Sequence, residues 1–170
     1  MSETVIQVTS LGKRIKGKTI LEEISFEINK GDCVALIGPN GAGKTVLMSC
    51  ILGDKKPSNG QVLIDGKAGK AKNKIAVLLQ ENTIPNSLKV EELIAFFQSI
   101  SDNPLTNQEV QELLQFKEDQ YQQFADKLSG GQRRLLAFVL CLIDKPKILF
   151  LDEPTAGMDT STRQRFWEIV

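Results

Sequence analysis

The chain has 170 residues, of which 41% are hydrophobic and 25% are charged, an ordinary composition for a soluble globular domain. Its 21 basic and 21 acidic side chains cancel, which disfavours a nucleic-acid binder because such proteins usually carry a basic excess. The three cysteines are scattered and form no CxxC pair, so neither a zinc site nor a disulfide framework is indicated. The longest apolar run, residues 135–143, is too short to cross a bilayer.

Short apolar runs predict the strands. "VIQVT" (5–9) and "ISFEI" (24–28) alternate apolar and polar residues and favour an antiparallel N-terminal β layer. "CVALI" (33–37), "IAVLL" (75–79) and "KILFL" (147–151) are almost wholly apolar, which is typical of parallel strands covered on both faces. We therefore expect a parallel sheet in addition to the antiparallel layer.

Helical patterns lie between these runs. A helix is expected from Lys44 to Leu52, where Gly53 stops it, and another over 90–100. "QVLIDG" (61–66) predicts a strand that ends in an Asp-Gly turn. Ser101 to Pro104 breaks the helical pattern, and Thr106 with Glu109 then fits a capping box that starts a further helix. Strands that alternate with helices predict an α/β fold.

A glycine-rich loop, "GPNGAGKT", matches the phosphate-binding pattern G-x-x-x-x-G-K-[ST]. It comprises Gly38, Pro39, Asn40, Gly41, Ala42, Gly43, Lys44 and Thr45. Glycine allows the backbone N–H groups to form an anion nest, to which the start of the next helix adds its positive end. Lys44 would reach the β- and γ-phosphates, and the Thr45 hydroxyl would bind Mg²⁺. A chemically silent glycine turn is the alternative, which the buried strand expected before the loop and the helix after it disfavour.

Two carboxylates end the apolar run "ILFLDEP" (148–154). Asp152 fits the metal-orienting aspartate of a Walker B motif. Glu153 is placed to polarise an attacking water, which requires that the water lie in line with the γ-phosphate. A solvated Asp-Glu turn would be the better interpretation of this pair alone, but not downstream of a phosphate-binding loop.

A second anion-binding helix start is predicted at "LSGGQRR" (128–134). Gly130 and Gly131 expose backbone N–H groups, Ser129 adds a hydroxyl and Gln132 adds a side-chain amide. One γ-phosphate does not need two such sites within one subunit. Two copies that face each other head to tail would use both, because each signature helix would close the nucleotide of the other copy.

These motifs, in this order, resemble those of the ATP-binding cassette (ABC) superfamily, and the resemblance covers nearly all of the chain. It implies a P-loop NTPase with a RecA-like parallel core, an N-terminal antiparallel β layer and an inserted helical subdomain. The chain would be a single ATP-binding domain, with its core and β layer in 1–79 and 127–170 and its helical subdomain in 80–126. The sequences of residues 78–97 and 133–159 are most similar to bacterial drug and lipid exporters whose permease is a separate protein.

The resemblance also implies roles and partners. Gln80 would be the Q-loop glutamine, which senses the metal and the γ-phosphate, and Asp159 in "AGMD" would be the D-loop aspartate. ATP and Mg²⁺ are the implied cofactors. The helical subdomain would dock onto a transmembrane permease, and the nucleotide-binding subunits would form a head-to-tail homodimer or heterodimer. No nucleic-acid partner is expected, and the implied location is the cytoplasmic face of the cell membrane.

The sequence departs from the family pattern at two positions. Val46 stands where the family usually has a second Ser or Thr, and it has no hydroxyl to donate to the α-phosphate. Ile15 stands where an aromatic ring often stacks on adenine. Isoleucine can still cover the base by apolar contact, but it discriminates less well between bases, so GTP is left as an alternative to ATP.

The chain contains no histidine, whereas the family has a switch histidine on a strand after the D-loop helix. The sequence stops at "FWEIV" within a helical pattern, before that strand would occur. We therefore expect a domain that is incomplete at its C-terminus and comes from a longer protein. The 170 residues alone are expected to be inactive, although their parent is expected to be an ATPase.

Three functions compete at this point. The first is the ATPase subunit of an export transporter. The second is a soluble ABC ATPase that acts on ribosomes or DNA, which is disfavoured by the neutral charge and by the lack of a second cassette or a long coiled coil. The third is a module that binds nucleotide without hydrolysis, which Lys44, Asp152 and Glu153 disfavour. The transported substrate is not encoded in these motifs, because the permease selects it.

Overall fold

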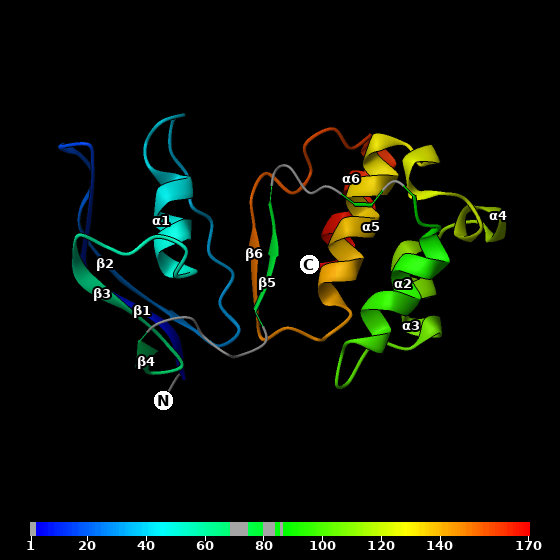
Figure 1. Cartoon of the computed structure of the whole chain (residues 1–170), viewed down its shortest axis with the longest axis horizontal. Helices are drawn as coiled ribbons and strands as arrows, with labels where there is room; N and C mark the ends of the chain where they lie inside the picture. The colour runs from blue at the N-terminus through cyan, green and yellow to red at the C-terminus, as the bar shows by residue number, and fades with distance from the viewer. Residues whose placement is uncertain (1–2, 69–74, 80–83, 86) are drawn as a thin grey trace. The chain divides into compact units, whose positions relative to one another are not determined.

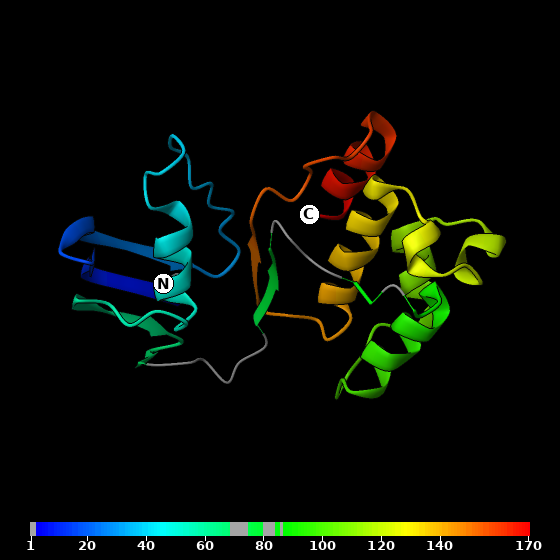
Figure 2. The same cartoon turned by 45° about the horizontal axis from the view of Figure 1, so that its top comes forward.

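Strands dominate the first part of the chain and helices the second (Figures 1 and 2). The computed structural model describes residues 3–68, 75–79, 84–85 and 87–170. The chain divides into two units, Met1–Lys72 and Asn73–Val170.

The first unit is built on an antiparallel sheet in the order β2-β1-β3-β4. Its elements are β1 (Thr4–Ile15), β2 (Lys18–Asn29), α1 (Lys44–Ile51), β3 (Asn59–Ile64) and β4 (Lys67–Ala68). Lys16 and Gly17 join β1 to β2 with φ of 48° and 80°, and Asp65 and Gly66 join β3 to β4 with φ of 48° and 70°. Positive φ at both central residues gives the tight turn whose twist matches that of a hairpin. The predicted β layer and Asp-Gly turn are confirmed.

The segment from Cys33 to Ile37 differs from its prediction. It forms no strand and pairs with no strand among the described residues, and the exposed fractions of Val34 and Ile37 are 60% and 90%. A turn at the end of β2, in which the Asp32 N–H donates to the Asn29 carbonyl and Gly31 has a φ of 86°, directs the chain off the sheet. An apolar strand needs a hydrogen-bonded neighbour to become buried, and the strands of this unit supply none. The predicted buried strand is therefore wrong for this structure.

The second unit combines a parallel strand pair with helices. Its elements are β5 (Ile75–Leu78), α2 (Val90–Ser99), α3 (Asn107–Leu114), α4 (Glu118–Tyr121), a 3₁₀ turn (Ala125–Lys127), α5 (Gly130–Leu142), β6 (Ile148–Leu151) and α6 (Thr160–Ile169). β5 and β6 pair in parallel, in a register that places Leu78 opposite Leu151. The strands predicted at both positions are confirmed, and their carboxyl ends meet at one edge.

The predicted helix starts are found where local chemistry supplies a cap. The Thr106 hydroxyl accepts a hydrogen bond from the Glu109 N–H at 3.2 Å, and the Glu109 carboxylate accepts one from the Thr106 N–H at 2.7 Å. This reciprocal arrangement satisfies two backbone donors that a helix start leaves without partners. It also holds the pKa of Glu109 below its usual value, chiefly through the Thr106 backbone N–H.

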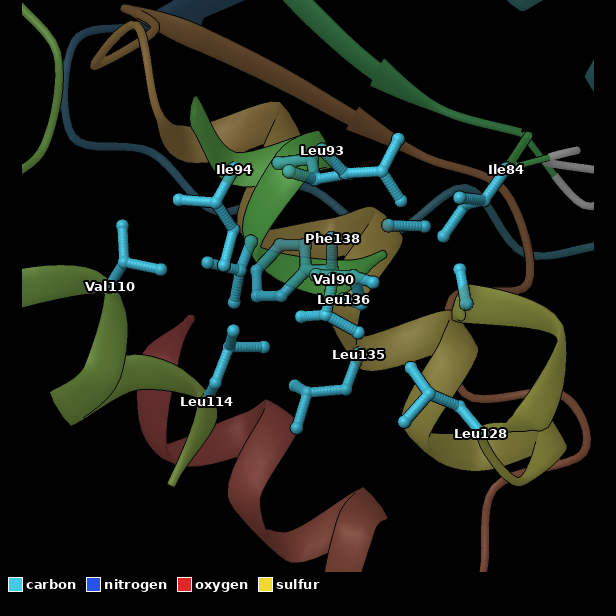
Figure 3. Packing of buried hydrophobic residues seen from close by; sticks show 14 of the residues in the cluster. Ile84, Val90, Leu93, Ile94, Val110, Leu114, Leu128, Leu135, Leu136 and Phe138 are labelled. Atoms are coloured by element: carbon cyan, nitrogen blue, oxygen red, sulfur yellow. The ribbon is translucent and has the colours of Figure 1, made fainter. Parts of the chain in front are cut away.

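The core of the second unit is organised around α5. Six consecutive residues, from Leu135 to Leu140, are buried, so α5 is covered on nearly its whole circumference. Figure 3 shows Phe138 among apolar side chains of α2, α3 and α5. Its ring lies 4.3 Å, centroid to centroid, from that of Phe166 on α6.

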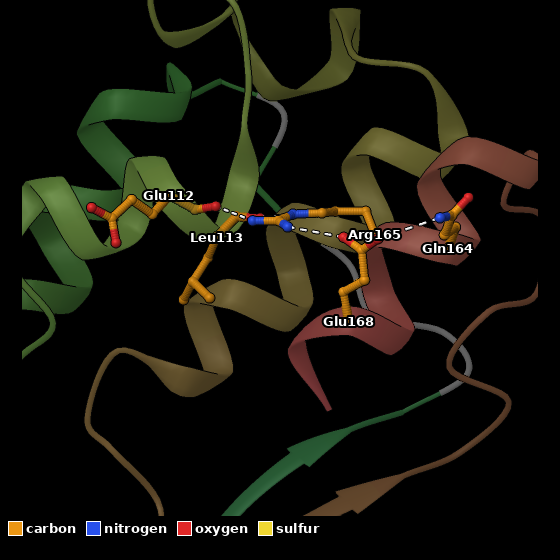
Figure 4. A network of polar contacts seen from close by, with 5 residues as sticks. All are labelled: Glu112, Leu113, Gln164, Arg165 and Glu168. Carbon is orange, nitrogen blue, oxygen red and sulfur yellow. Dashed lines mark hydrogen bonds and ion pairs between the residues drawn. The ribbon is translucent and has the colours of Figure 1, made fainter.

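The carbonyl end of α3 is capped by a side chain of α6. Arg165 donates from Nε to the Leu113 carbonyl at 3.1 Å and from Nη2 to the Glu112 carbonyl (Figure 4). Its Nη1 also contacts the Glu168 carboxylate at 3.0 Å. The last carbonyls of a helix have no partner within the helix, so a guanidinium at this point stabilises the junction of α3 and α6.

The packing predicts that Phe138 contributes strongly to stability. Phe138→Ala should lower the free energy of unfolding by about 3–5 kcal/mol, because it leaves a cavity inside a fully buried cluster. Phe96→Ala is the matched control, since Phe96 is 54% exposed on α2 and loses much less packing. Urea denaturation followed by circular dichroism measures both. Equal losses for the two variants would contradict the assignment of α5 as the centre of the core.

Candidate functional site

The glycine loop leads directly into α1, as predicted. Gly43 is the N-cap of α1, with a φ of 90°, and Gly41 has a φ of 82°. A Cβ at Gly43 would lie 3.0 Å from Leu21 Cδ2 and 3.2 Å from the Ile20 carbonyl oxygen, both in β2. Backbone angle and close approach therefore both require glycine at position 43.

The start of α1 is left open to an anion. Among the residues that the structure describes, no side chain caps it, and its first turn contains no acidic residue. Because the first N–H groups of a helix lack internal acceptors and carry the positive end of its dipole, such a start favours a negatively charged ligand. Thr45 is exposed in this first turn, where its hydroxyl oxygen is available as a metal ligand.

Lys44 lies over the loop that precedes it. Its ammonium donates to the Gly38 carbonyl at 2.6 Å and to the Pro39 carbonyl at 2.9 Å. A positive charge, the open helix start and the exposed loop backbone are thus concentrated around residues 38–45. This set of groups can bind a phosphate chain.

The two departures from the family pattern lie in the same unit as the loop. Val46 is half-buried on α1, and no hydroxyl is present at this position. Ile15 ends β1 beside the Lys16–Gly17 turn and is 37% exposed. Its side chain can therefore offer an apolar surface to a ligand.

A second polar group lies at the carboxyl ends of β5 and β6. Asp152 and Glu153 directly follow β6, and the Asp152 N–H donates to the Leu78 carbonyl at 2.9 Å, which continues the pairing of the strands. Glu153 has a φ of 45°, in the left-handed region that costs a non-glycine residue free energy. The carboxylate predicted to act in catalysis therefore sits on a strained backbone.

The start of α5 is held by a capping box between two predicted site residues. The Gln132 N–H donates to the Ser129 hydroxyl at 3.2 Å, and the Ser129 N–H donates to the Gln132 side-chain oxygen at 3.1 Å. Gly130 has open space where a Cβ would lie. At Gly131 a Cβ would lie 3.2 Å from Asp159 Oδ2, so the structure brings these two predicted residues together.

Asp159 caps α6. Its carboxylate accepts from the Ser161 hydroxyl at 2.6 Å, from the Thr162 hydroxyl at 2.8 Å and from the Thr162 N–H at 3.0 Å. These hydrogen bonds, that of Ser161 first, hold the pKa of Asp159 far below its usual value. Asp159 therefore stays charged at neutral pH and fixes the start of α6 next to that of α5.

Comparison with known proteins identifies the family. Residues 21–156 match the ABC transporter domain family. The chain belongs to the ABC transporter family. None of the described helices is long and apolar enough to cross a membrane.

Relatives of this ABC chain include import and export proteins. It is 35% identical over 164 residues to the spermidine/putrescine import ATP-binding protein of Protochlamydia amoebophila, covering 91% of this chain and 44% of that protein. It is 33% identical over 178 residues to the Nod factor export ATP-binding protein I of Sinorhizobium fredii, covering 98% and 51%. The chain thus spans about half the length of these relatives.

Solved structures confirm the fold class predicted for this ABC chain. A post-hydrolysis dimer of an ATP-binding cassette bound to ADP and Pi aligns with a TM-score of 0.79 at 20% identity, over 96% of this chain and 80% of that one. A bacterial Atm1-family ABC exporter with ATP bound aligns with a TM-score of 0.81 at 24% identity, over 98% and 32%. The P-loop NTPase prediction is confirmed, whereas the limits of the 80–126 subdomain stay a prediction.

The predicted site residues of the ABC chain fall into separate sets. Residues 38–46 belong to the unit Met1–Lys72, whereas 129–132, 152–153 and 159 belong to Asn73–Val170. Gln80, predicted as a catalytic and metal-binding residue, lies outside the described residues. The roles of all these residues stay predictions.

Sequence reasoning missed Arg134. It is buried, with 9% exposure, and donates hydrogen bonds to four backbone carbonyls near the carboxylates. One signal was available: Arg134 lies four residues before Phe138 and so faces the same side of an apolar helix. A charge on that face needs polar partners inside the protein.

Proposed function

We propose that this chain is the ATP-binding and ATP-hydrolysing part of an ABC transporter. One observation carries the proposal: an uncapped helix start, preceded by glycines at positive φ and covered by the Lys44 ammonium, forms an anion site at the family's phosphate loop. Membership of the ABC family supports ATP as the nucleotide. Ile15 in place of an aromatic leaves room for GTP as a second substrate.

The phosphate chain is bound by the loop. The backbone N–H groups of 38–45 hold the phosphates, and Lys44 turns from the Gly38 and Pro39 carbonyls toward the β- and γ-phosphates. Thr45, Gln80 and Asp152 are the residues that would hold Mg²⁺, a metal that takes oxygen ligands and would neutralise charge on the phosphates. Val46 leaves the α-phosphate without a hydroxyl donor.

Hydrolysis is assigned to Glu153. Its carboxylate accepts a proton from the water that attacks the γ-phosphate, and Gln80 helps to place that water and the metal. Ser129, Gly130, Gly131 and Gln132 bind the γ-phosphate of a second subunit, with Asp159 at the same junction. A protein of the same fold was solved as a dimer, and the head-to-tail arrangement, as a homodimer or a heterodimer, would use both anion-binding helix starts.

The transport direction proposed is export, with a separate permease. Two observations support export: the sequences around the motifs, and a Nod factor export relative that matches over 98% of this chain. Importers are also among the relatives. In this role the subunit works on the cytoplasmic face of the membrane and needs no nucleic acid. Closure of two subunits on ATP turns the permease, and hydrolysis resets it.

A groove in the helical part suits a permease loop. It lies among α2, α3 and α4, has a volume of about 460 Å³, and is lined by Glu91, Glu92 and Glu118 above the buried side chains of Ile94 and Val110. Cytoplasmic loops of membrane proteins carry an excess of Lys and Arg. We therefore assign this groove to a basic loop of the permease, with an apolar side chain that covers the floor.

Lys44→Ala should weaken ATP binding, because it removes the positive charge that faces the β- and γ-phosphates. A loss of about tenfold or more is expected for one charge-assisted contact. Titration with a fluorescent ATP analogue measures the affinity. Lys30→Ala is the control, since Lys30 is an exposed lysine of the same unit that pairs with Glu3, away from the loop. Equal affinity of the Lys44 variant and the wild type would contradict the phosphate site.

Glu153→Gln should abolish most hydrolysis while ATP still binds, because the amide keeps the shape of the side chain but does not accept the proton of water. A decrease in turnover of about 10²–10⁴-fold is expected for a lost general base. Phosphate release by the full-length protein measures it, and Glu112→Gln on α3 is the control. Wild-type turnover in the Glu153 variant would exclude this residue as the base.

Glu91→Lys should release the permease. A lysine in the groove would repel the basic loop, and like charges in an interface cost several kcal/mol, which is on the order of a hundredfold or more in affinity. Co-purification with the membrane protein encoded in the neighbouring reading frame measures binding. Glu112→Lys makes the same charge change on the same helical part, outside the groove. Equal loss from both variants would point to a general charge effect.

A further inference from the structure

Arg134 connects the start of α5 to the carboxyl ends of both parallel strands. It lies in the second turn of α5, five residues after the Ser129 cap. Its Nη2 donates to the Asp152 carbonyl at 2.9 Å and to the Glu153 carbonyl at 3.3 Å, and its Nε donates to the Pro154 carbonyl at 3.2 Å. Its Nη1 donates to the Leu79 carbonyl, one residue beyond β5.

The geometry of a guanidinium suits this position. Strands end with carbonyls that the ladder no longer satisfies, and an arginine carries five N–H donors in a fixed planar fork. Burial lowers the pKa of Arg134, and the nearby Asp152 and Glu153 carboxylates act in the opposite direction. The charge is therefore retained inside the protein by the carbonyls and by the two carboxylates proposed to act on metal and water.

The backbone that Arg134 holds is the strained one. Glu153 has a φ of 45°, which a non-glycine residue keeps only when its surroundings enforce it. The guanidinium contacts the carbonyls of Glu153 and of both its neighbours, so one side chain fixes three consecutive peptide groups. A shift of about 1 Å in a catalytic group costs on the order of 10²-fold in rate.

We propose that Arg134 is a positioning residue for ATP hydrolysis. It holds the Glu153 backbone so that the carboxylate points toward the attacking water. It also binds the Leu79 carbonyl, which precedes Gln80, and so connects both backbone segments to the start of α5. A movement of the signature helix therefore moves the proposed base. The inference rests on the proposed ATPase function and adds to it a residue that acts through the backbone of Glu153.

Arg165 provides the matched control. It too spans backbone carbonyls with its guanidinium, those of Glu112 and Leu113, but at the end of α3 and not at the carboxylates. Loss of either arginine leaves backbone carbonyls without their hydrogen-bond donors, so both losses should lower the stability of the fold to a similar extent. Only the loss of Arg134 releases the Glu153 backbone.

The test compares Arg134→Gln, Arg134→Lys and Arg165→Gln in the full-length protein. Turnover, ATP affinity and melting temperature are measured for each. Arg134→Gln should lower kcat by about 10–100-fold with ATP affinity within about twofold, and Arg165→Gln should lower the melting temperature while kcat stays within about twofold. Arg134→Lys keeps the charge but lacks the fork, so kcat should remain low. This variant also keeps the test valid if the glutamine variant does not fold.

A double variant separates positioning from stability. Arg134→Gln combined with Glu153→Gln should hydrolyse ATP no more slowly than Glu153→Gln alone, because the group that Arg134 positions is already inactive. Turnover in the Arg134 variants that matches Arg165→Gln, or a multiplicative loss in the double variant, would overturn the inference. Wild-type turnover in Glu153→Gln would instead overturn the proposed function, so the two failures are distinguishable.

Discussion

The burial of α5 is the constraint on which the second unit depends. Six consecutive apolar residues of this helix, Leu135 to Leu140, are buried, and α2, α3, α6 and β5 pack against it. A helix buried on most of its surface has little freedom to rotate or slide, because interiors are packed as densely as crystals. Its position therefore fixes the positions of the groups at its start, where Ser129 and Gln132 form the capping box.

Polar groups at the ends of elements divide into those that are satisfied internally and those that are left open. Arg134 satisfies the carboxyl ends of β5 and β6, Arg165 satisfies the end of α3, and Asp159 satisfies the start of α6. The start of α1 has no such side chain. Because an unsatisfied helix start carries a free energy cost, its openness at the phosphate loop is better explained by a ligand than by stability.

Local chemistry explains what could be predicted from the sequence. The Asp65–Gly66 turn and the Thr106 capping box depend on neighbours within a few residues, and both occur as predicted. Arg134 could not be assigned, because its partners are carbonyls up to 55 residues away, and any residue type supplies a carbonyl. The strand predicted at 33–37 was wrong for a different reason. Its apolar pattern is that of a strand, but a strand also needs a hydrogen-bonded neighbour, which composition does not reveal.

Gly131, at the start of α5, lies next to Asp159, the residue that caps α6. A Cβ at position 131 would lie 3.2 Å from Asp159 Oδ2, so a larger residue would have to displace this carboxylate, and glycine lets the two helix starts lie close together. Asp159 in turn is held by Ser161 and Thr162, and Arg134 holds the ends of β5 and β6 from the next turn of α5. The proposed signature and hydrolytic groups are thus joined through α5 by hydrogen bonds, and the proposed D-loop aspartate lies against the same helix at Gly131. A displacement of α5 by a bound nucleotide would reach all three together, because Ser129 and Gln132 cap this helix, Arg134 binds the backbone on both sides of Glu153, and Gly131 lies against Asp159.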